Sequence, residues 1–345
     1  MTSASQILQG NRLALAKLLT QIENNTTDGR AALAELFPKT GGAYRIGVTG
    51  APGTGKSSLV NQLALHFRRS EALGSMRVAV VAVDPSSPFT GGAILGDRVR
   101  MRDLLGDPGV FIRSMASRGS LGGLAVATSG VVQALDAAGF EIILIETVGA
   151  GQAEVDIARL AHTTLVIEAP GLGDDIQAIK AGILEIADVL VINKADRPGV
   201  ENTERALRSM LQLGHPMVRR FQSHTRETGH LSTDNEAVGM KTSSEKPELP
   251  LWIPPIVRTI ATEGQGIPEL AGAIEQHRQH LQLSGEWSQR ELNRLHAELD
   301  LLVRETLMSR WLSRTPPENY QQVLERVIRR ELSPWQAADE LVKEC

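Results

Sequence analysis

One stretch of the chain has the residue types and the spacing that triphosphate binding requires. Residues 50–57 read Gly-Ala-Pro-Gly-Thr-Gly-Lys-Ser and fit the phosphate-binding loop G-x-x-x-x-G-K-[ST]. An apolar run precedes the loop and a helical pattern follows it, which is the strand–loop–helix order that the motif needs. Backbone N–H groups of such a loop, together with the helix N-terminus, bind phosphate oxygens. A glycine-rich turn that only joins a strand to a helix is the weaker alternative.

Individual positions of this loop have predicted roles. Lys56 is expected to reach the β- and γ-phosphates, which makes it a candidate catalytic residue, and the Ser57 hydroxyl is expected to coordinate Mg²⁺. The residues predicted to contact the nucleotide here are Gly50, Pro52, Gly53, Thr54, Gly55, Lys56, Ser57 and Ser58.

Three acidic residues are candidates for the neighbourhood of the metal ion. Glu146 ends an apolar run, which is the Walker B arrangement that positions Mg²⁺ or its water. Asp84 follows another apolar run, and Asp97 lies farther along the loop after it. Because Mg²⁺ keeps several waters, at most one of Asp84 and Asp97 is expected to be a direct ligand. The alternative for both is a capping role at a turn or at a helix start.

A glycine-rich segment follows Glu146 and is predicted to respond to the γ-phosphate. Gly149 can offer its backbone N–H to that phosphate, so residues 147–154 form a candidate switch. Gln152 is a candidate for orienting the attacking water. A glutamine in a glycine-rich loop is also often only a loop residue, so this role stays open.

Residues 193–196, Asn-Lys-Ala-Asp, follow a third apolar run and indicate which base is bound. The Asp196 carboxylate can accept from guanine N1–H and the exocyclic amine, whereas adenine would leave it unpaired, and such a site rejects the wrong base strongly. Asn193 is expected at the other edge of the purine and the Lys194 stem over the base. Ala261, in the turn at residues 260–267, is expected to close over the base through its backbone. GTP and GDP are therefore the predicted ligands.

The strands that must position these side chains are visible as short apolar runs. Their nearly continuous Val/Ile/Leu character is typical of parallel strands buried on both faces. Helical patterns between the runs indicate a doubly wound, mostly parallel α/β sheet, in which ligands bind at the carboxyl ends of the strands. The predicted strands are Tyr44–Thr49, Val78–Val83, Val110–Ile112, Glu141–Ile145, Thr164–Ile167, Val189–Ile192 and Ile256–Ile260.

Helical extensions are predicted on both sides of this sheet. Residues 3–24 read as one amphipathic helix and residues 29–37 as a second. The long leucine-rich pattern after residue 286 suits either dimerisation or a cap over the chain's own sheet. The predicted domains are an N-terminal helical arm (1–40), a P-loop GTPase domain (41–283, with a polar insertion at about 215–250) and a C-terminal helical arm (284–345).

Composition narrows the class of protein further. The 345 residues carry a net charge of −4, which disfavours a general nucleic-acid binder. Cys345 is the single cysteine, which excludes an internal disulfide framework and a cysteine metal cage. Residues 1–6 lack the pattern of a signal peptide, and no apolar run is long enough to span a bilayer. We therefore expect a cytoplasmic protein that binds neither nucleic acid nor membrane.

Four strings of residues carry a family resemblance: 83–88 (Val-Asp-Pro-Ser-Ser-Pro), 91–97 (Gly-Gly-Ala-Ile-Leu-Gly-Asp), 146–152 (Glu-Thr-Val-Gly-Ala-Gly-Gln) and 173–180 (Gly-Asp-Asp-Ile-Gln-Ala-Ile-Lys). With them, the chain resembles the methylmalonyl-CoA mutase-associated GTPases of the MeaB/ArgK type, in the SIMIBI class of P-loop GTPases. The resemblance runs from about residue 10 to the C-terminus.

This resemblance implies a GTPase that gates adenosylcobalamin loading and protects an acyl-CoA mutase, which in turn accelerates GTP hydrolysis. It implies that Asp84, Asp97 and Glu146 match the acidic residues around Mg²⁺. It also implies that a third switch contacts the mutase, with Asp174 and Lys180 as the charged candidates, and that the C-terminal arm forms a homodimer. Ala51 stands where some SIMIBI ATPases have an extra lysine, so a lysine supplied across a dimer is not expected.

Two other GTPase or kinase classes remain as alternatives. A metallochaperone GTPase has a similar fold, but it needs Cys and His ligands near its switches, and here the histidines are scattered. A P-loop kinase needs an acceptor pocket and a base near the γ-phosphate, and guanine selection makes it less favoured. A nucleotide-binding module that does not hydrolyse GTP is the third alternative.

Overall fold

The computed structural model of the chain describes residues 3–69, 75–85, 101–104, 106–117, 123–147, 157–171, 185–213 and 250–343. The chain divides into two compact units, residues 1–294 and 295–345. Helix α11 crosses the boundary between them. None of the helices that the structure describes combines the length and the apolar character needed to span a bilayer.

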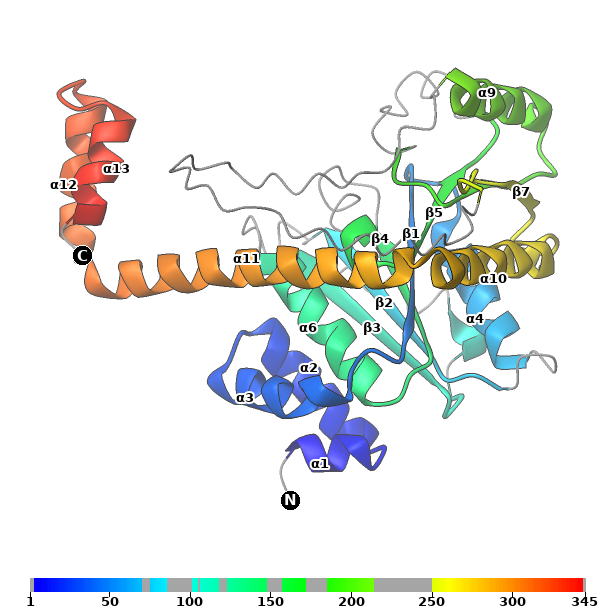
Figure 1. Cartoon of the computed structure of the whole chain (residues 1–345), viewed down its shortest axis with the longest axis horizontal. Helices are drawn as coiled ribbons and strands as arrows, with labels where there is room; N and C mark the ends of the chain where they lie inside the picture. Colours follow the sequence, from blue (N-terminus) through cyan, green and yellow to red (C-terminus); the bar gives the residue numbers. More distant parts are fainter. Residues whose placement is uncertain are drawn as a thin grey trace, which may run out of the picture. The chain divides into compact units, whose positions relative to one another are not determined.

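The first unit is built on a sheet of seven strands in the described part of the chain, all parallel, in the order β3-β2-β4-β1-β5-β6-β7 (Figure 1). All seven predicted strands are present, which confirms the doubly wound α/β fold. The strands are β1 (Tyr44–Gly50), β2 (Val78–Pro85), β3 (Val110–Ser117), β4 (Ile142–Thr147), β5 (Thr163–Glu168), β6 (Val189–Asn193) and β7 (Ile256–Thr259).

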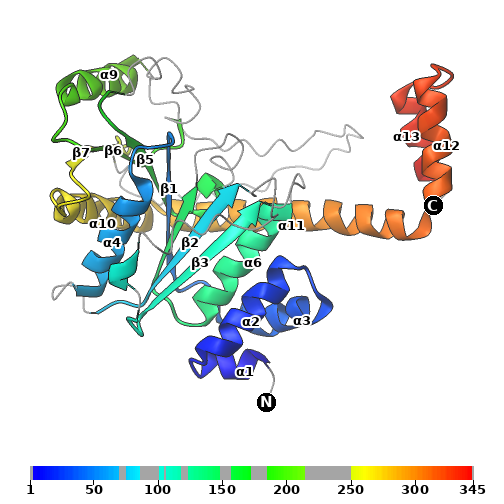
Figure 2. The same ribbon diagram turned by 180° about the vertical axis from the view of Figure 1, so that it is seen from behind.

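Helices cover both faces of the sheet. They are α1 (Ser3–Leu8), α2 (Arg12–Glu23), α3 (Thr27–Leu36), α4 (Lys56–Arg69), α6 (Gly123–Ala137), α9 (Val200–Leu213) and α10 (Ile267–Ser284), with short 3₁₀ turns η1 (Phe37–Lys39) and η2 (Arg102–Leu104). Alternate strand residues point to opposite layers. In β4, for example, Ile142 and Leu144 pack in the cluster with α4 and α10, and Ile143 and Ile145 pack in the cluster with α1–α3 and α6. Figure 2 shows α4 and α6 on opposite sides of the sheet.

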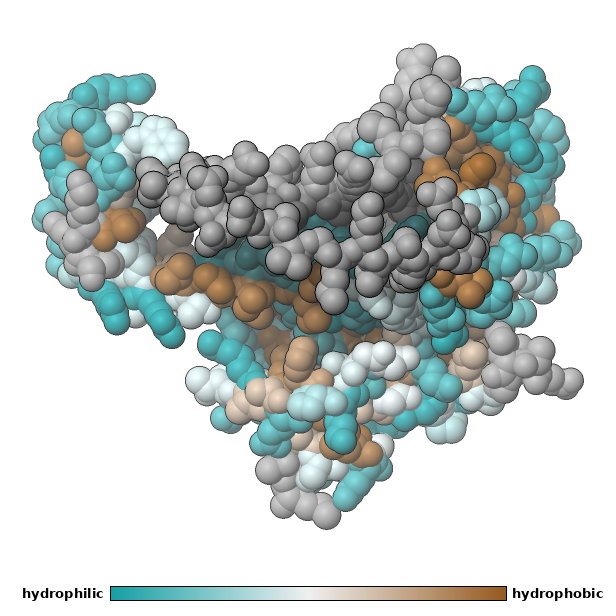
Figure 3. Space-filling view, in the orientation of Figure 1, coloured by the Kyte–Doolittle hydropathy of each residue, from teal (hydrophilic) through white to brown (hydrophobic). Residues whose placement is uncertain are grey.

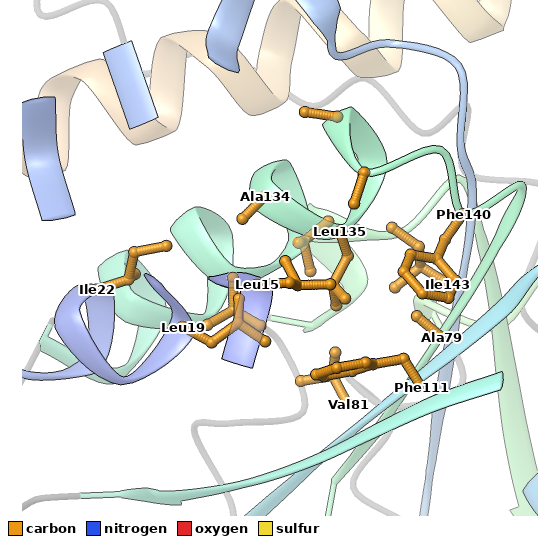
Figure 4. Close-up of a cluster of buried hydrophobic side chains, with 14 of the residues drawn as sticks. Leu15, Leu19, Ile22, Ala79, Val81, Phe111, Ala134, Leu135, Phe140 and Ile143 are labelled. Atoms are coloured by element: carbon orange, nitrogen blue, oxygen red, sulfur yellow. The ribbon is translucent and has the colours of Figure 1, made fainter. Parts of the chain in front are cut away.

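The N-terminal segment differs from the prediction of one helix over residues 3–24. It forms two helices, because Gly10 adopts a left-handed φ of 83° and the Asn11 side chain then accepts a hydrogen bond from Ala14 N (3.0 Å) as a new N-cap. Helix α2 packs its apolar face, including Leu15 and Leu19, against α6 and the sheet (Figure 4). The N-terminal helices therefore belong to the core of the first unit.

The C-terminal helices are α11 (Glu286–Arg314), α12 (Pro317–Ile328) and α13 (Pro334–Lys343). The residues of α11 are exposed or half-buried, and Arg290 is among the half-buried ones. A row of hydrophobic side chains follows this helix in the space-filling view (Figure 3). Its exposed apolar residues are Leu292, Leu295, Leu299, Leu302, Val303, Leu307, Met308 and Leu312. In the second unit, α12 and α13 pack through Val323, Ala337 and Leu341, and Trp311 Nε1 donates to Leu341 O (3.0 Å).

Candidate functional site

The candidate site lies along the carboxyl-terminal edge of the sheet, where the strand order places the predicted motifs near one another. Strand β1 leads into the phosphate loop and pairs with β4, so Val48 lies opposite Glu146. On the other side of β1, strands β5, β6 and β7 follow in turn, and β6 ends at Asn193. The candidate metal residues and the candidate base residues thus flank the loop from opposite sides.

The phosphate loop between β1 and α4 is closed by its own polar groups. Thr54 Oγ1 donates to Ala51 O (2.9 Å). The buried Lys56 ammonium donates to Gly50 O (2.9 Å) and to Ala51 O (3.0 Å). Lys56 is the first residue of α4 and crosses back over the loop, where its charge can meet phosphate oxygens. Around it, Pro52 and Gly53 are exposed and Ser58 is half-buried in the first turn of α4.

Ser57 and Glu146 form a direct contact beside this loop. Ser57 Oγ donates to Glu146 Oε1 at 2.6 Å, and both side chains are buried. One residue beyond Glu146, Thr147 Oγ1 donates to Thr49 Oγ1 (3.2 Å), which links the ends of β4 and β1. A hydroxyl and a carboxylate at this distance offer the hard oxygen ligands that Mg²⁺ prefers, so the residues present fit a magnesium site.

Asn193 connects the predicted base motif to the phosphate loop. Its Nδ2 donates to Thr54 O (2.8 Å), and its Oδ1 accepts from Ala261 N (3.1 Å) and from Thr259 Oγ1 (3.2 Å). The side chain is 2% exposed. Both ends of the amide therefore serve contacts within the protein, whereas the sequence suggested an edge of the purine. Asn193 holds three loops of the site together.

Gly55 makes the approach of Asn193 possible. Its φ is 93°, and a Cβ at this position would lie 2.4 Å from Asn193 Nδ2. The glycine is therefore needed both for the left-handed backbone and for the space that the asparagine amide occupies. The second glycine of the phosphate-loop motif thus has a tertiary role as well as a local one.

The remaining base residues surround the same place. Lys194 has a φ of 58° and its Nζ donates to Gly53 O at 2.5 Å, so its stem runs from the base motif to the phosphate loop. The Asp196 side chain is exposed, two residues farther on. Ala261 is buried in the turn after β7, and that turn is closed by Ile260 N donating to Gln265 O (3.0 Å). The structure therefore brings Asn193, Lys194 and Ala261 together with the phosphate loop.

Several predicted residues cannot be placed in the same way. Asp84 is the penultimate residue of β2, where its backbone is paired with Ala116, and its side chain lies outside what the structure describes. Also outside the described residues are Asp97, Gly149, Gln152, Asp174, Lys180 and positions 215–249 of the predicted insertion.

Sequence analysis missed Thr259 and Thr49. Both are buried, and each holds a functional residue or strand end through its hydroxyl. The sequence feature that could have indicated these two residues is a threonine at the end of a strand beside a recognised motif. It is weak, because threonine is common in strands for reasons of packing.

Comparison with known proteins gives a consistent result. The sequence profile of the family described as methylmalonyl Co-A mutase-associated GTPase MeaB matches residues 15–316. A Pyrococcus abyssi protein named as a GTPase is 41% identical over 336 residues, which cover 97% of this chain and 94% of the relative. The Caenorhabditis elegans protein called methylmalonic aciduria type A homolog, mitochondrial, is 26% identical, with 98% and 80% covered.

A solved structure has the same fold over nearly its full length. The crystal structure of a LAO/AO transport system kinase superposes with a TM-score of 0.67 at 26% identity, and the match covers 99% of this chain and 95% of that chain. The family profile and the relative from Pyrococcus abyssi both identify a GTPase, and the solved structure agrees in fold. The chain belongs to the family of methylmalonyl-CoA mutase-associated GTPases, the MeaB family, and is a P-loop GTPase.

Proposed function

We propose that this GTPase gates the loading of adenosylcobalamin into an acyl-CoA mutase, such as methylmalonyl-CoA mutase, and protects that enzyme. The family description names association with methylmalonyl-CoA mutase, and the name of the Caenorhabditis elegans relative refers to methylmalonic aciduria. Both names support a client of this class. GTP binding and hydrolysis are then the timing signal, and the client accelerates hydrolysis.

One observation carries the nucleotide part of the proposal: Asn193 ties the base motif to the phosphate loop through Thr54 O. A single side chain therefore couples the place where the base is read to the place where phosphates bind. In this assignment Asp196 accepts from guanine N1–H and the exocyclic amine, and the backbone of Ala261 closes over the base. Lys56 contacts the β- and γ-phosphates, with the loop N–H groups around them.

Mg²⁺ is the metal that suits the oxygen groups beside the loop. Ser57 and Glu146 would hold it, Glu146 directly or through water, and Asp84 or Asp97 would add at most one further ligand. When bound, the ion supplies positive charge against the phosphate oxygens. Gln152 is proposed to orient the attacking water, and the Gly149 N–H to contact the γ-phosphate. Asp174 and Lys180 are proposed contacts for the client.

The C-terminal arm, residues 284–345, is proposed to form a homodimer. Leu292, Leu295, Leu299 and Leu302 follow the three- and four-residue spacing of a coiled-coil seam, and all four are exposed. A second copy of α11 would cover such a seam. Sedimentation should find a dimer for the parent and a monomer for Leu299→Glu; a monomeric parent contradicts this part of the proposal.

The test of the function is phosphate release from GTP by the full chain, alone and with a purified adenosylcobalamin-dependent mutase. Slow release that rises when the mutase is added supports the proposal, and Lys180→Ala should lose the increase while keeping the basal rate. Lys17→Ala, a change in α2, is the matched control and should keep both. A basal rate that no acyl-CoA mutase changes would contradict the client assignment and favour a metallochaperone.

A further inference from the structure

A second polar cluster lies at the opposite, amino-terminal edge of the sheet, and we name it the basal cluster. It joins the starts of three strands to α10 and to the first turns of α11. Its central members are Arg45 of β1, His162 and Asp188, which directly precede β5 and β6, His277 of α10, and Arg290 and Glu291 of α11. Arg294 and Glu286 of α11 lie beside Glu291 and Arg290.

Asp188 is the centre of this cluster on the β6 side. Its side chain is 1% exposed, and Arg290 binds it in a bidentate manner, with NH1–Oδ2 and NH2–Oδ1 both at 3.0 Å. Thr164 N donates to Oδ2 (2.8 Å), and His277 Nε2 lies 3.4 Å from Oδ1. A buried carboxylate with a planar two-point partner is held in one orientation.

Arg290 is fixed from its other side as well. Its NH1 also donates to His162 O (2.6 Å), so a single guanidinium links the residues that precede β5 and β6. Burial alone would lower the pKa of Arg290, but the carboxylate of Asp188 raises it, so the guanidinium stays charged. Trp252 Nε1 donates to the Asp188 carbonyl (2.8 Å), which adds a further tie at the start of β6.

Strand β6 connects this anchor directly to the guanine motif. It contains only Val189–Asn193, and all five residues are buried. At about 3.3 Å per residue, the anchor and Asn193 are roughly 16 Å apart along one strand. This short strand is hydrogen-bonded to β5 and β7 and closely packed, so it resists internal deformation. A shift of Asp188 would therefore be transmitted to Asn193 and the residues after it.

We propose that Arg290 is a positioning residue for guanine recognition, which acts through Asp188 and β6 to hold Asp196 where it meets the base. This inference rests on the proposed contact between Asp196 and guanine. It links the first turns of α11 to the selectivity of the nucleotide site. Movement of those turns would therefore change how well the site distinguishes guanine from related bases.

The measured quantity is the ratio of affinities for GTP and for inosine triphosphate, which lacks the exocyclic amine. A partly unfolded preparation weakens both affinities by the same factor, so only a displaced Asp196 changes the ratio. Arg290→Met should lower the ratio by about tenfold, the worth of a hydrogen bond to a charged group. Arg290→Lys keeps the charge and should retain part of the ratio. Arg304→Met, an exposed change on the same helix, should leave it unchanged.

A double variant addresses the buried charge that Arg290→Met leaves behind. Asp188→Asn combined with Arg290→Met removes both charges and keeps an amide oxygen for Thr164 N. If charge burial were the only issue, the double variant would recover the parental ratio of GTP to inosine triphosphate affinity. A low ratio in the folded double variant supports the positioning role, and a parental ratio overturns it.

Reciprocity supplies a second measurement on the parent protein. If the arrangement of the basal cluster alters the affinity for GDP, then GDP binding must shift the equilibrium between arrangements of the basal cluster by the same free energy. Trp287 reports on that cluster because its ring stacks on His162, with centroids 3.9 Å apart. With 5-fluorotryptophan incorporated, the ¹⁹F resonance of Trp287, assigned from Trp287→Phe, should shift on addition of GDP. The exposed Trp335 is the internal reference, and a Trp287 resonance that GDP leaves in place overturns the inference.

Failure of the base assignment gives a different pattern. Asp196→Asn should itself lower the ratio of GTP to inosine triphosphate affinity. If Asp196→Asn has no effect, the proposed guanine contact is wrong. If Asp196→Asn lowers the ratio while the Arg290 variants and the Trp287 resonance do not respond, only the positioning role is wrong.

Discussion

The two polar edges of the sheet are built in contrasting ways. At the carboxyl edge, the phosphate loop draws on residues within eight positions of one another, and side chains such as Lys56 bind carbonyls five and six residues away. At the amino edge, Arg45, His162 and Arg290 each come from separate segments, with Arg290 and Asp188 separated by 102 positions. A site built from local motifs can be recognised in a sequence even when packing brings distant motifs together, whereas a cluster of isolated residues that only tertiary packing assembles cannot.

The carboxyl edge should respond to substitution mainly through activity. Lys56→Ala removes the cation that is proposed to contact the β- and γ-phosphates, so GTP hydrolysis should fall by about 100-fold or more, the scale of a lost transition-state donor. Phosphate release measures this, and the thermal midpoint should stay close to the parental value. Lys39→Ala, an exposed change in η1, is the control. A Lys56→Ala protein that hydrolyses GTP at the parental rate would contradict the catalytic role given to the carboxyl edge of the sheet.

Gly55→Ala tests the tertiary contact at the same edge. The new Cβ would meet Asn193 Nδ2 at a φ of 93°, and such strain costs about 1–3 kcal/mol. Affinity for GDP should therefore weaken by about tenfold. Gly272→Ala in α10 is the matched control, because nothing lies within 4 Å of its Cβ. It should raise the free energy of unfolding by about 0.5–1 kcal/mol and leave GDP affinity unchanged.

If Gly55→Ala binds GDP as tightly as the parent, Asn193 does not brace the phosphate loop in the way described. Affinity measured by calorimetry and unfolding measured by denaturant separate the two effects. Both substitutions add the same methyl group. A difference in their effects on GDP affinity or on the free energy of unfolding therefore comes from the surroundings of the glycine.

The basal cluster should also respond through stability, with a distinct pH dependence. His162 Nδ1 accepts from Arg45 N (3.1 Å), and its Nε2 lies 2.8 Å from Glu291 Oε1 and 2.8 Å from the Arg45 guanidinium. Burial, followed by the positive charges of Arg45 and Arg290, holds the pKa of His162 well below its usual range. The folded protein therefore keeps this imidazole neutral.

The unfolded chain takes up a proton at His162 below about pH 6.5, whereas the folded chain does not. Its contribution to stability is thus complete above that pH and is lost as the pH falls, by up to about 1.4 kcal/mol per pH unit. The free energy of unfolding of the parent and of His162→Gln should be measured by urea unfolding between pH 7 and pH 5, a range that includes the ordinary histidine pKa. It should fall less steeply with falling pH in the variant than in the parent. Equal slopes would contradict a neutral, buried His162.

Most of the fold could be predicted because parallel strands leave continuous apolar runs in the sequence. The exceptions have physical causes. Strand β3 continues to Ser117, five residues past the prediction, because Arg113 and Ser114 interrupt the apolar run on an edge strand that pairs with β2. The break at Gly10 was hidden because apolar spacing continues across it in both helices.

The site divides in the same manner. Lys56, Ser57 and Glu146 are recognisable because each stands at a fixed place in a strand–loop unit. The bracing role of Asn193 could not be predicted, since it depends on β6 lying two strands from β1 with β5 between them. Arg290 was equally invisible, because an arginine in an exposed, leucine-rich helix looks like any solvated charge until Asp188 is placed beside it.

Base selection tests the central claim most directly. Phosphate release should be measured from GTP and ATP by the parent and by Asp196→Asn under the same conditions. The proposed guanine contact predicts that the parent hydrolyses GTP and discriminates strongly against ATP, because adenine would leave the Asp196 carboxylate unpaired, and that Asp196→Asn loses this preference. An Asp196→Asn protein that separates GTP from ATP as well as the parent does would contradict the assignment of the guanine site.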